Sequence, residues 1–166
     1  VCSSDLALGS GDPRVERMFE RVARAYPDRV GVKLGFDEAL AHRIEAGADA
    51  FLLPSRYEPC GLSQLYSLRY GTVPIVRKTG GLADTVVPYT PQTAAEGRAT
   101  GFAFSAATPD ALLTSILLAL RVYANPSEWA SLVQAGMATD VSWEKSAKEY
   151  EALYRRALTL SKKRPG

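Results

Sequence analysis

Hydrophobic and polar positions along the chain follow two spacings in turn, and the alternation predicts strands separated by helices. Short apolar runs that end at glycine, proline or a charged residue predict parallel strands at residues 6–8, 30–34, 50–53, 73–76 and 101–104. Apolar positions three and four residues apart predict helices at residues 13–23, 38–44, 62–70, 111–123, 128–137 and 143–160. This order predicts an α/β fold with a parallel, doubly wound, Rossmann-like sheet and a helical C-terminal segment.

Helix starts are marked by a recurring local signal, a capping residue followed by proline. It occurs at Asp12-Pro13, Thr108-Pro109 and Asn125-Pro126. Asp37 is the predicted N-cap of the second helix. Residues 88–100 combine proline, threonine, glycine and charged residues without periodicity, which predicts a surface loop.

The stretch that joins strand 50–53 to helix 62–70 contains a carboxylate, a thiol and a glycine, namely Glu58, Cys60 and Gly61. In an open α/β sheet, ligands bind beyond the carboxyl ends of the strands. A helix that begins near Gly61 presents unpaired backbone N–H groups and the positive end of its dipole at that position. The sequence therefore predicts an anion site here, with phosphate as the favoured ligand.

A second glycine-containing turn follows strand 73–76. Its two adjacent glycines, Gly80 and Gly81, allow backbone N–H groups to approach a ligand closely. The turn at residues 9–12 is a weaker signal, because a lone Gly-x-Gly lacks the third glycine of the dinucleotide fingerprint. A tight strand-to-helix turn is the favoured interpretation there, and a dinucleotide-dependent oxidoreductase is a poorly supported alternative.

Composition restricts the classes of protein that remain. The chain has 166 residues, of which 46% are hydrophobic and 23% charged, as in one globular domain. Its 20 basic and 18 acidic residues give a net charge of +2, which argues against a nucleic-acid surface, and the basic residues 162–164 are interpreted as a solvated tail. The two cysteines, Cys2 and Cys60, form no disulfide framework, which favours a reducing, cytoplasmic compartment. We expect no membrane partner, because no apolar run approaches the length of a membrane span.

Three motifs carry a family resemblance: EPCGLSQLY at residues 58–66, YGTVP at 70–74 and TGGLADTV at 79–86. Together with shorter matches from residue 9 to residue 143, they resemble bacterial glycogen synthase and plant starch synthase over residues 6 to about 158. The resemblance implies the GT-B fold, in which two Rossmann-like lobes close over a cleft, and this chain matches most of the C-terminal lobe. It also implies retaining transfer of glucose from ADP-glucose to the non-reducing end of an α-1,4-glucan, with no metal and no cofactor.

The resemblance implies a division of the chain as well. Residues 6–140 match the nucleotide-sugar-binding lobe, incomplete at its N-terminus, and residues 141–166 match a helix that crosses to the other lobe, plus a basic tail. Residues 1–5 are interpreted as a truncated or non-native start. The expected partners are ADP-glucose, the glucan and the N-terminal lobe of the same enzyme, without which we expect no transfer.

Family roles transfer to this chain residue by residue. Glu58 matches the catalytic-site glutamate beside the donor glucose, where a carboxylate favours an oxocarbenium-like transition state. Covalent participation of Glu58 and transfer on one face with help from the leaving phosphate both remain open. The other implied donor contacts are Phe36 with adenine, Tyr66 with ribose, Cys60 with the sugar, Gly61, Leu62 and Ser63 with the diphosphate, and Thr79, Gly80 and Gly81 with the glucose.

Some of these roles have a structural alternative. For Phe36 the alternative is a core aromatic residue at a strand end. Tyr66 stands where many members of the wider retaining group have a second glutamate, which weakens the ribose assignment. The sequence gives no reason for His42 to reach Cys60, so His42 is predicted to be structural and Cys60 non-catalytic. A non-catalytic nucleotide-sugar or glucan-binding module is the alternative function.

Overall fold

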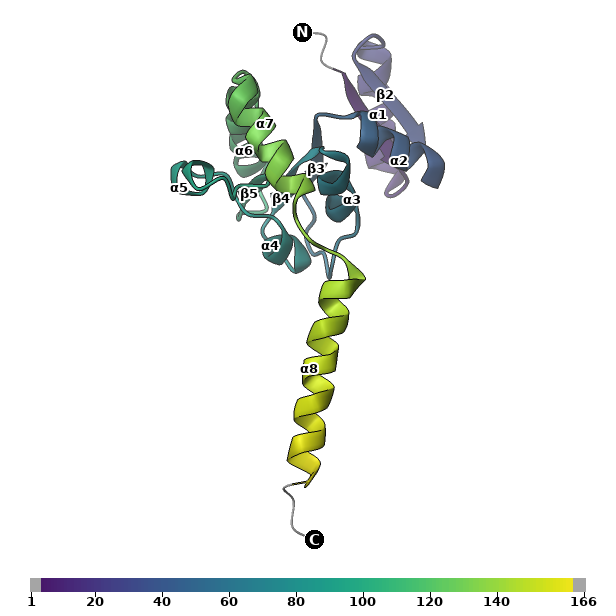
Figure 1. Ribbon diagram of the computed structural model, residues 1–166. Coiled ribbons are helices and arrows are strands. Elements are labelled where there is room, and N and C mark those ends of the chain that lie inside the picture. Colours follow the sequence, from purple (N-terminus) through teal and green to yellow (C-terminus); the bar gives the residue numbers. More distant parts are fainter. Residues whose placement is uncertain (1–3, 163–166) are drawn as a thin grey trace.

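The computed structural model describes residues 4–162, and strands and helices alternate along them (Figure 1). The strands are β1 (Asp5–Gly9), β2 (Val30–Leu34), β3 (Ala50–Leu53), β4 (Val73–Arg77) and β5 (Phe102–Phe104). The helices are α1 (Pro13–Ala25), α2 (Glu38–Gly47), α3 (Ser63–Tyr70), α4 (Gly81–Thr85), α5 (Pro91–Ala95), α6 (Pro109–Tyr123), α7 (Pro126–Met137) and α8 (Trp143–Lys162). The predicted α/β class with a helical C-terminal segment is confirmed.

Predicted caps account for three of the helix starts. The Asp12 side chain accepts a hydrogen bond from Arg14 N at 2.8 Å, and Asp37 accepts one from Leu40 N at 2.9 Å. Thr108 accepts one from Ala111 N at 3.3 Å. Asn125 precedes α7 but makes no capping bond; its amide instead donates to Glu128 Oε1 at 2.7 Å.

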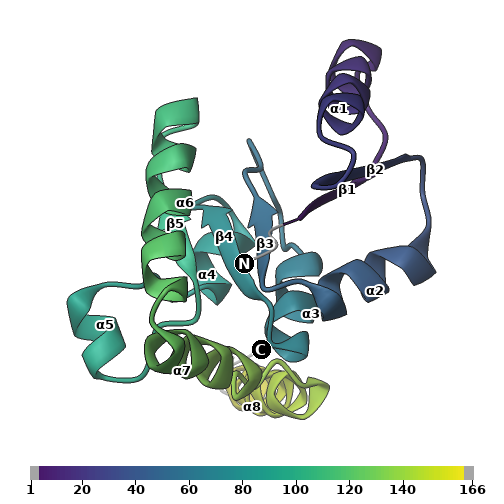
Figure 2. The ribbon, with the colours of Figure 1, turned by 90° about the horizontal axis from the view of Figure 1, so that it is seen from above.

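The strands form two parallel sheets where the sequence predicted one. β1 pairs with β2, and β3, β4 and β5 form a separate sheet in that order. The two sheets lie apart, with β1, β2 and α1 set to one side of the three-stranded sheet (Figure 2). Within residues 4–162, no ladder of hydrogen bonds joins β1 or β2 to the second sheet, so the single sheet does not form.

The hydrophobic core belongs to the three-stranded sheet. Every residue of β4 except Arg77 is buried. The larger cluster of buried side chains comprises Val73, Ile75, Ala99, Phe102, Ala119, Val122 and Leu132. β3 lies at the edge of its sheet and is less buried, with Leu52 47% exposed.

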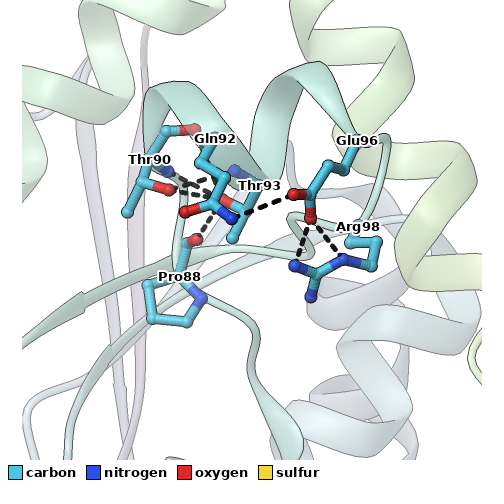
Figure 3. Close-up of polar contacts among 6 residues, drawn as sticks. All are labelled: Pro88, Thr90, Gln92, Thr93, Glu96 and Arg98. Atoms are coloured by element: carbon cyan, nitrogen blue, oxygen red, sulfur yellow. Dashed lines mark hydrogen bonds and ion pairs between the residues drawn. The ribbon is translucent and has the colours of Figure 1, made fainter.

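The predicted loop at residues 88–100 contains a short helix, α5, so that prediction is partly wrong. Thr90 and Thr93 form a reciprocal capping box at its start, and Thr93 Oγ1 also donates to Pro88 O at 2.7 Å (Figure 3). At the other end, Glu96 accepts from Gln92 at 3.0 Å and from Arg98 Nε at 2.7 Å. A helix of five residues spans too little sequence for an apolar period to reveal it.

Helix α8 extends away from the rest of the molecule (Figure 1). Its apolar stripe is exposed along the helix, at Tyr150, Leu153, Tyr154 and Leu158. No helix within residues 4–162 is both long and apolar enough to span a membrane. The roles predicted for residues 6–140 and 141–166 remain predictions.

Candidate functional site

Two loops meet at the carboxyl ends of neighbouring parallel strands. We call residues 54–62, which follow β3, the glutamate loop, and residues 78–81, which follow β4, the glycine loop. Because β3 and β4 pair in parallel, both loops leave the same edge of the sheet. Gly81 N lies 3.1 Å from Glu58 O and 3.2 Å from Pro59 O and donates to both. The structure thus brings the two predicted site loops into direct contact.

The contact depends on two glycines. A Cβ atom on Gly80 would lie 1.9 Å from Glu58 O, and one on Gly81 would lie 2.2 Å from Cys60 O. These distances are far below van der Waals contact, and both clashes involve backbone atoms that cannot rotate away. Gly80 also has φ +46, which side chains rarely adopt. The double glycine predicted to bring its backbone close to a ligand therefore brings that backbone close to the glutamate loop.

Arg77, the last residue of β4, fixes the beginning of the glutamate loop. Its Nε donates to Ser55 O at 2.7 Å, and a second guanidinium nitrogen donates to Arg56 O. The third nitrogen donates to Ser105 O at 3.4 Å, on the segment that follows β5. The predicted strand ends at residue 76, and the sequence assigns Arg77 no role. A charged residue between an apolar strand and a glycine turn was the signal that could have identified it.

Helix α3 begins with an open N-terminus. Its N-cap, Leu62, is 57% exposed and offers no side-chain acceptor to the first-turn N–H groups. Gly61 precedes it with φ +70. With no side-chain cap, these N–H groups are available to an anion, and the phosphate site remains a prediction.

The predicted site residues differ in exposure. Cys60 is an exposed free thiol, and Glu58, Ser63 and Thr79 are half-buried. Tyr66 is 41% exposed on the first turn of α3. Phe36 lies in the connection between β2 and α2 and is 91% exposed, so the alternative of a core aromatic residue is wrong.

His42, on α2, packs against two tyrosines of α3, in agreement with its predicted structural role. Its ring meets the rings of Tyr66 and Tyr70 edge-on, with centroids 5.2 and 6.2 Å away. Its Nδ1 lies 3.4 Å from Glu45 Oε2, a close polar contact that lacks hydrogen-bond geometry. Burial raises the pKa of Glu45, while His42 and the Ser63 hydroxyl act in the opposite direction. This cluster joins α2 to the beginning of α3.

A small pocket between α5 and α7 lies away from these loops. Tyr89 and Glu128 line it, and they bond each other at 2.7 Å, so the polar groups facing the pocket are already paired. In the described part of the chain, no three histidine, cysteine or acidic residues are grouped closely enough to hold a metal ion. The two loops at the sheet edge remain the better candidate site.

Comparison with known proteins identifies the family. The model of the glycosyl transferases group 1 matches residues 11–136. The chain belongs to this family. A glycogen synthase of Anaeromyxobacter sp. (strain K) is 61% identical over 148 residues, which cover 89% of this chain and 30% of that relative. Glycogen synthase 1 of Methylococcus capsulatus is 58% identical over 153 residues, or 92% of this chain and 31% of the relative.

Solved structures agree with this assignment. The catalytic domain of starch synthase IV from Arabidopsis thaliana, bound to ADP and acarbose, matches with a TM-score of 0.82 and 38% identity, over 94% of this chain and 32% of that one. The sucrose-phosphate synthase of Thermosynechococcus elongatus matches with a TM-score of 0.64 and 27% identity, over 93% of this chain and 38% of that one. These matches confirm the resemblance to glycogen and starch synthases and the GT-B class. The chain spans about a third of the length of these relatives.

Proposed function

We propose that this chain forms the donor-binding part of an ADP-glucose-dependent glycogen synthase, which transfers glucose to the non-reducing end of an α-1,4-glucan with retention at the anomeric carbon. The observation that carries the proposal is the contact between the two loops, in which Gly81 N donates to Glu58 O at 3.1 Å. This bond joins the backbone at Glu58 to the glycine loop, which supports the proposal that an acid and a set of main-chain donors serve one binding site.

Each part of the site has a chemical task in this proposal. The Glu58 carboxylate stabilises the positive charge that develops on the sugar ring as the bond to the diphosphate breaks. The N–H groups of Gly61, Leu62 and Ser63 bind the diphosphate. The main chain of Thr79 and Gly80 binds the glucose, and Gly81, whose N–H donates to the glutamate loop, completes the turn beside it. In transfer on one face, the glucan hydroxyl oxygen bonds to the anomeric carbon as the bond to the diphosphate breaks, and the hydroxyl proton passes to the departing phosphate. In the covalent alternative, the Glu58 carboxylate displaces the diphosphate first. The glucan oxygen then displaces Glu58, and its proton passes to the ADP that is still bound.

The helix N-terminus does not suffice to hold a diphosphate. A helix end contributes about 0.3–1 kcal/mol to anion binding at the surface and roughly 2 when partly buried. We therefore propose that basic residues elsewhere in the enzyme also contribute, and a second lobe of the same enzyme is the expected partner. Phe36 and Tyr66 are proposed to contact adenine and ribose. We also propose a cytoplasmic enzyme that needs no cofactor or metal.

The starch synthase match supports the donor class, because that structure contains ADP together with acarbose. The alternative function, a module that binds nucleotide sugar or glucan without catalysis, would use the same loops. The two functions differ in what Glu58 does, since only an enzyme needs its carboxylate for turnover.

The deciding experiment substitutes Glu58 in the protein expressed from its complete coding sequence. We expect Glu58→Ala to lower glucosyl transfer from ADP-glucose to glycogen at least about 100-fold, as the loss of a transition-state contact does. ADP binding, measured by calorimetry, should stay within roughly 3-fold of the unsubstituted protein, because the phosphate contacts are main-chain groups. Glu38→Ala, at an exposed acid on α2, is the matched control.

Retained turnover in Glu58→Ala would remove the role assigned to this residue. Absence of transfer by the unsubstituted protein, with intact ADP binding, would favour the binding module instead. Assays with ADP-glucose and UDP-glucose in parallel would establish which nucleotide the protein uses.

A further inference from the structure

Gln64 is the second residue of α3, and its side chain lies wholly inside the protein with 0% exposure. Its Nε2 donates to Cys60 O at 3.0 Å and to Thr85 Oγ1 at 3.1 Å. Thr85 is the last residue of α4, and its hydroxyl donates to Gly81 O at 2.7 Å. We call this series of bonds, from Cys60 through Gln64 and Thr85 to Gly81, the Gln64 bridge.

The Gln64 bridge closes a ring between the two loops. One end is the carbonyl of Cys60 in the glutamate loop, and the other is Gly81 in the glycine loop. Gly81 N in turn donates to Glu58 O at 3.1 Å, two residues before Cys60. A buried side-chain amide therefore fixes the position of one loop relative to the other, close to Glu58.

The bonding of Gln64 is poorly suited to stability alone. Its Oε1 is buried and has no hydrogen-bond partner among the described residues. A buried acceptor without a partner is destabilising. Replacing both partners of a buried hydrogen bond by apolar side chains of the same shape can be nearly neutral or even stabilising. Glycine at position 61 also makes room for this amide, because a Cβ there would lie 2.2 Å from Gln64 Oε1.

We propose that Gln64 and Thr85 are positioning residues that set the distance between the Glu58 carboxylate and the main-chain donors of the glycine loop. The inference rests on the proposed function, because it assigns the bridge a task in glucosyl transfer. Neither residue needs to touch the substrate. A displacement of about 1 Å between groups that act together can lower a rate roughly 100-fold, so a small shift between the loops is sufficient.

The test uses the protein expressed from its complete coding sequence, with Gln64→Met, Thr85→Val and the double variant. Each single variant should lower kcat about 10-fold or more, while KM for ADP-glucose changes less than about 3-fold, because geometry rather than binding is lost. The double variant should be no slower than the slower single variant, since either change breaks the same bridge. Thr85→Ser retains the hydroxyl and should keep most of the rate.

Thr114→Val is the matched control. Thr114 Oγ1 donates to Asp110 O at 2.8 Å, four residues back in α6, as Thr85 Oγ1 does to Gly81 O in α4, but at an exposed position. Its rate should not change. Hydrogen exchange supplies a readout without substrate: the peptide containing Gly81 should exchange faster in Gln64→Met and Thr85→Val, whereas the peptide containing β4 should not.

The outcomes separate this inference from the proposed function. An active unsubstituted protein whose kcat is unaffected in both single variants overturns the positioning role only. The positioning role is also overturned if the rate losses of the two single variants multiply in the double variant. It is likewise overturned if the loss of rate in each variant is proportional to its loss of thermal stability. An unsubstituted protein without transfer activity overturns both proposals, even if the exchange of Gly81 changes as expected.

Discussion

Two segments of the chain can be compared: one contains β1, α1, β2 and α2, and the other contains the three-stranded sheet. Both are built from parallel strands and helices, yet they bury very different numbers of side chains. Between residues 5 and 47, Glu45 is the only buried residue, and α1 leaves its apolar stripe exposed at Val15, Met18, Phe19 and Val22. All of the buried hydrophobic residues in the described chain lie between residues 68 and 132.

This difference shows where precise geometry can be maintained. A packed core holds its loops at fixed distances, because displacement of any element opens voids or causes clashes. The glutamate and glycine loops follow β3 and β4 and so derive their positions from that core. Phe36 follows β2 in the segment without a core, so we expect its position to vary more than that of Glu58.

The largest expected effect comes from the glycine loop. Gly81→Ala places a methyl group 2.2 Å from Cys60 O, so the two loops must separate. We expect glucosyl transfer by the full-length protein to fall more than about 100-fold. Gly47→Ala, in the segment without a core, is the control, because nothing lies within 4 Å of its added Cβ. Equal activity of the two variants would contradict the tight contact between the loops.

The next largest effect is a difference in stability between the two segments when a phenylalanine side chain is truncated. Phe102 is 1% exposed and Phe19 is 46% exposed. We expect Phe102→Ala to lower the free energy of unfolding by about 3–5 kcal/mol. Phe19→Ala should cost less than about 1 kcal/mol, because much of its surface is already in water. Urea denaturation measures both values, and similar losses would mean that the first segment has a core of its own.

Phe36 offers a smaller test. Because its side chain is 91% exposed, Phe36→Ala should leave stability unchanged. Loss of an aromatic stacking partner is worth about 0.5–1.5 kcal/mol, so ADP affinity should fall roughly 2- to 12-fold. Phe36→Tyr should preserve it, since stacking does not need the hydroxyl. Calorimetry measures the affinity of each variant for ADP. An unchanged affinity in Phe36→Ala would contradict the proposed contact between Phe36 and adenine.

The smallest expected effect concerns pH. Burial raises the pKa of Glu45 above its ordinary value of 4.5, so the folded protein binds this proton more tightly than the unfolded chain does. Stability contributed by the protonated form is therefore fully present below about pH 4.5 and decreases as pH rises through the higher folded pKa. Glu45→Gln should remove this part of the pH dependence, which urea titrations at several pH values would show. If the free energy of unfolding depends on pH in the same way in Glu45→Gln, the proposed contribution of Glu45 is contradicted.

Local patterns predicted most elements and the two loops, because the period of apolar residues and the caps at Asp12, Asp37 and Thr108 act within one or two helical turns. They missed α4 and α5, which are too short to show a period. They also missed the division into two sheets, because pairing between strands depends on partners distant in sequence. The bond between Gln64 and Thr85 spans 21 positions and has no local signal at all.

The outer side of β3 has a further consequence for the behaviour of this polypeptide in solution. Within residues 4–162, β3 bonds only to β4, so its other row of amides and carbonyls faces outward beside the half-exposed Leu52. Such a row can recruit any extended segment, including that of another molecule. Concentrated preparations of the 166-residue chain should therefore self-associate, and light scattering over a dilution series would detect the loss of these assemblies.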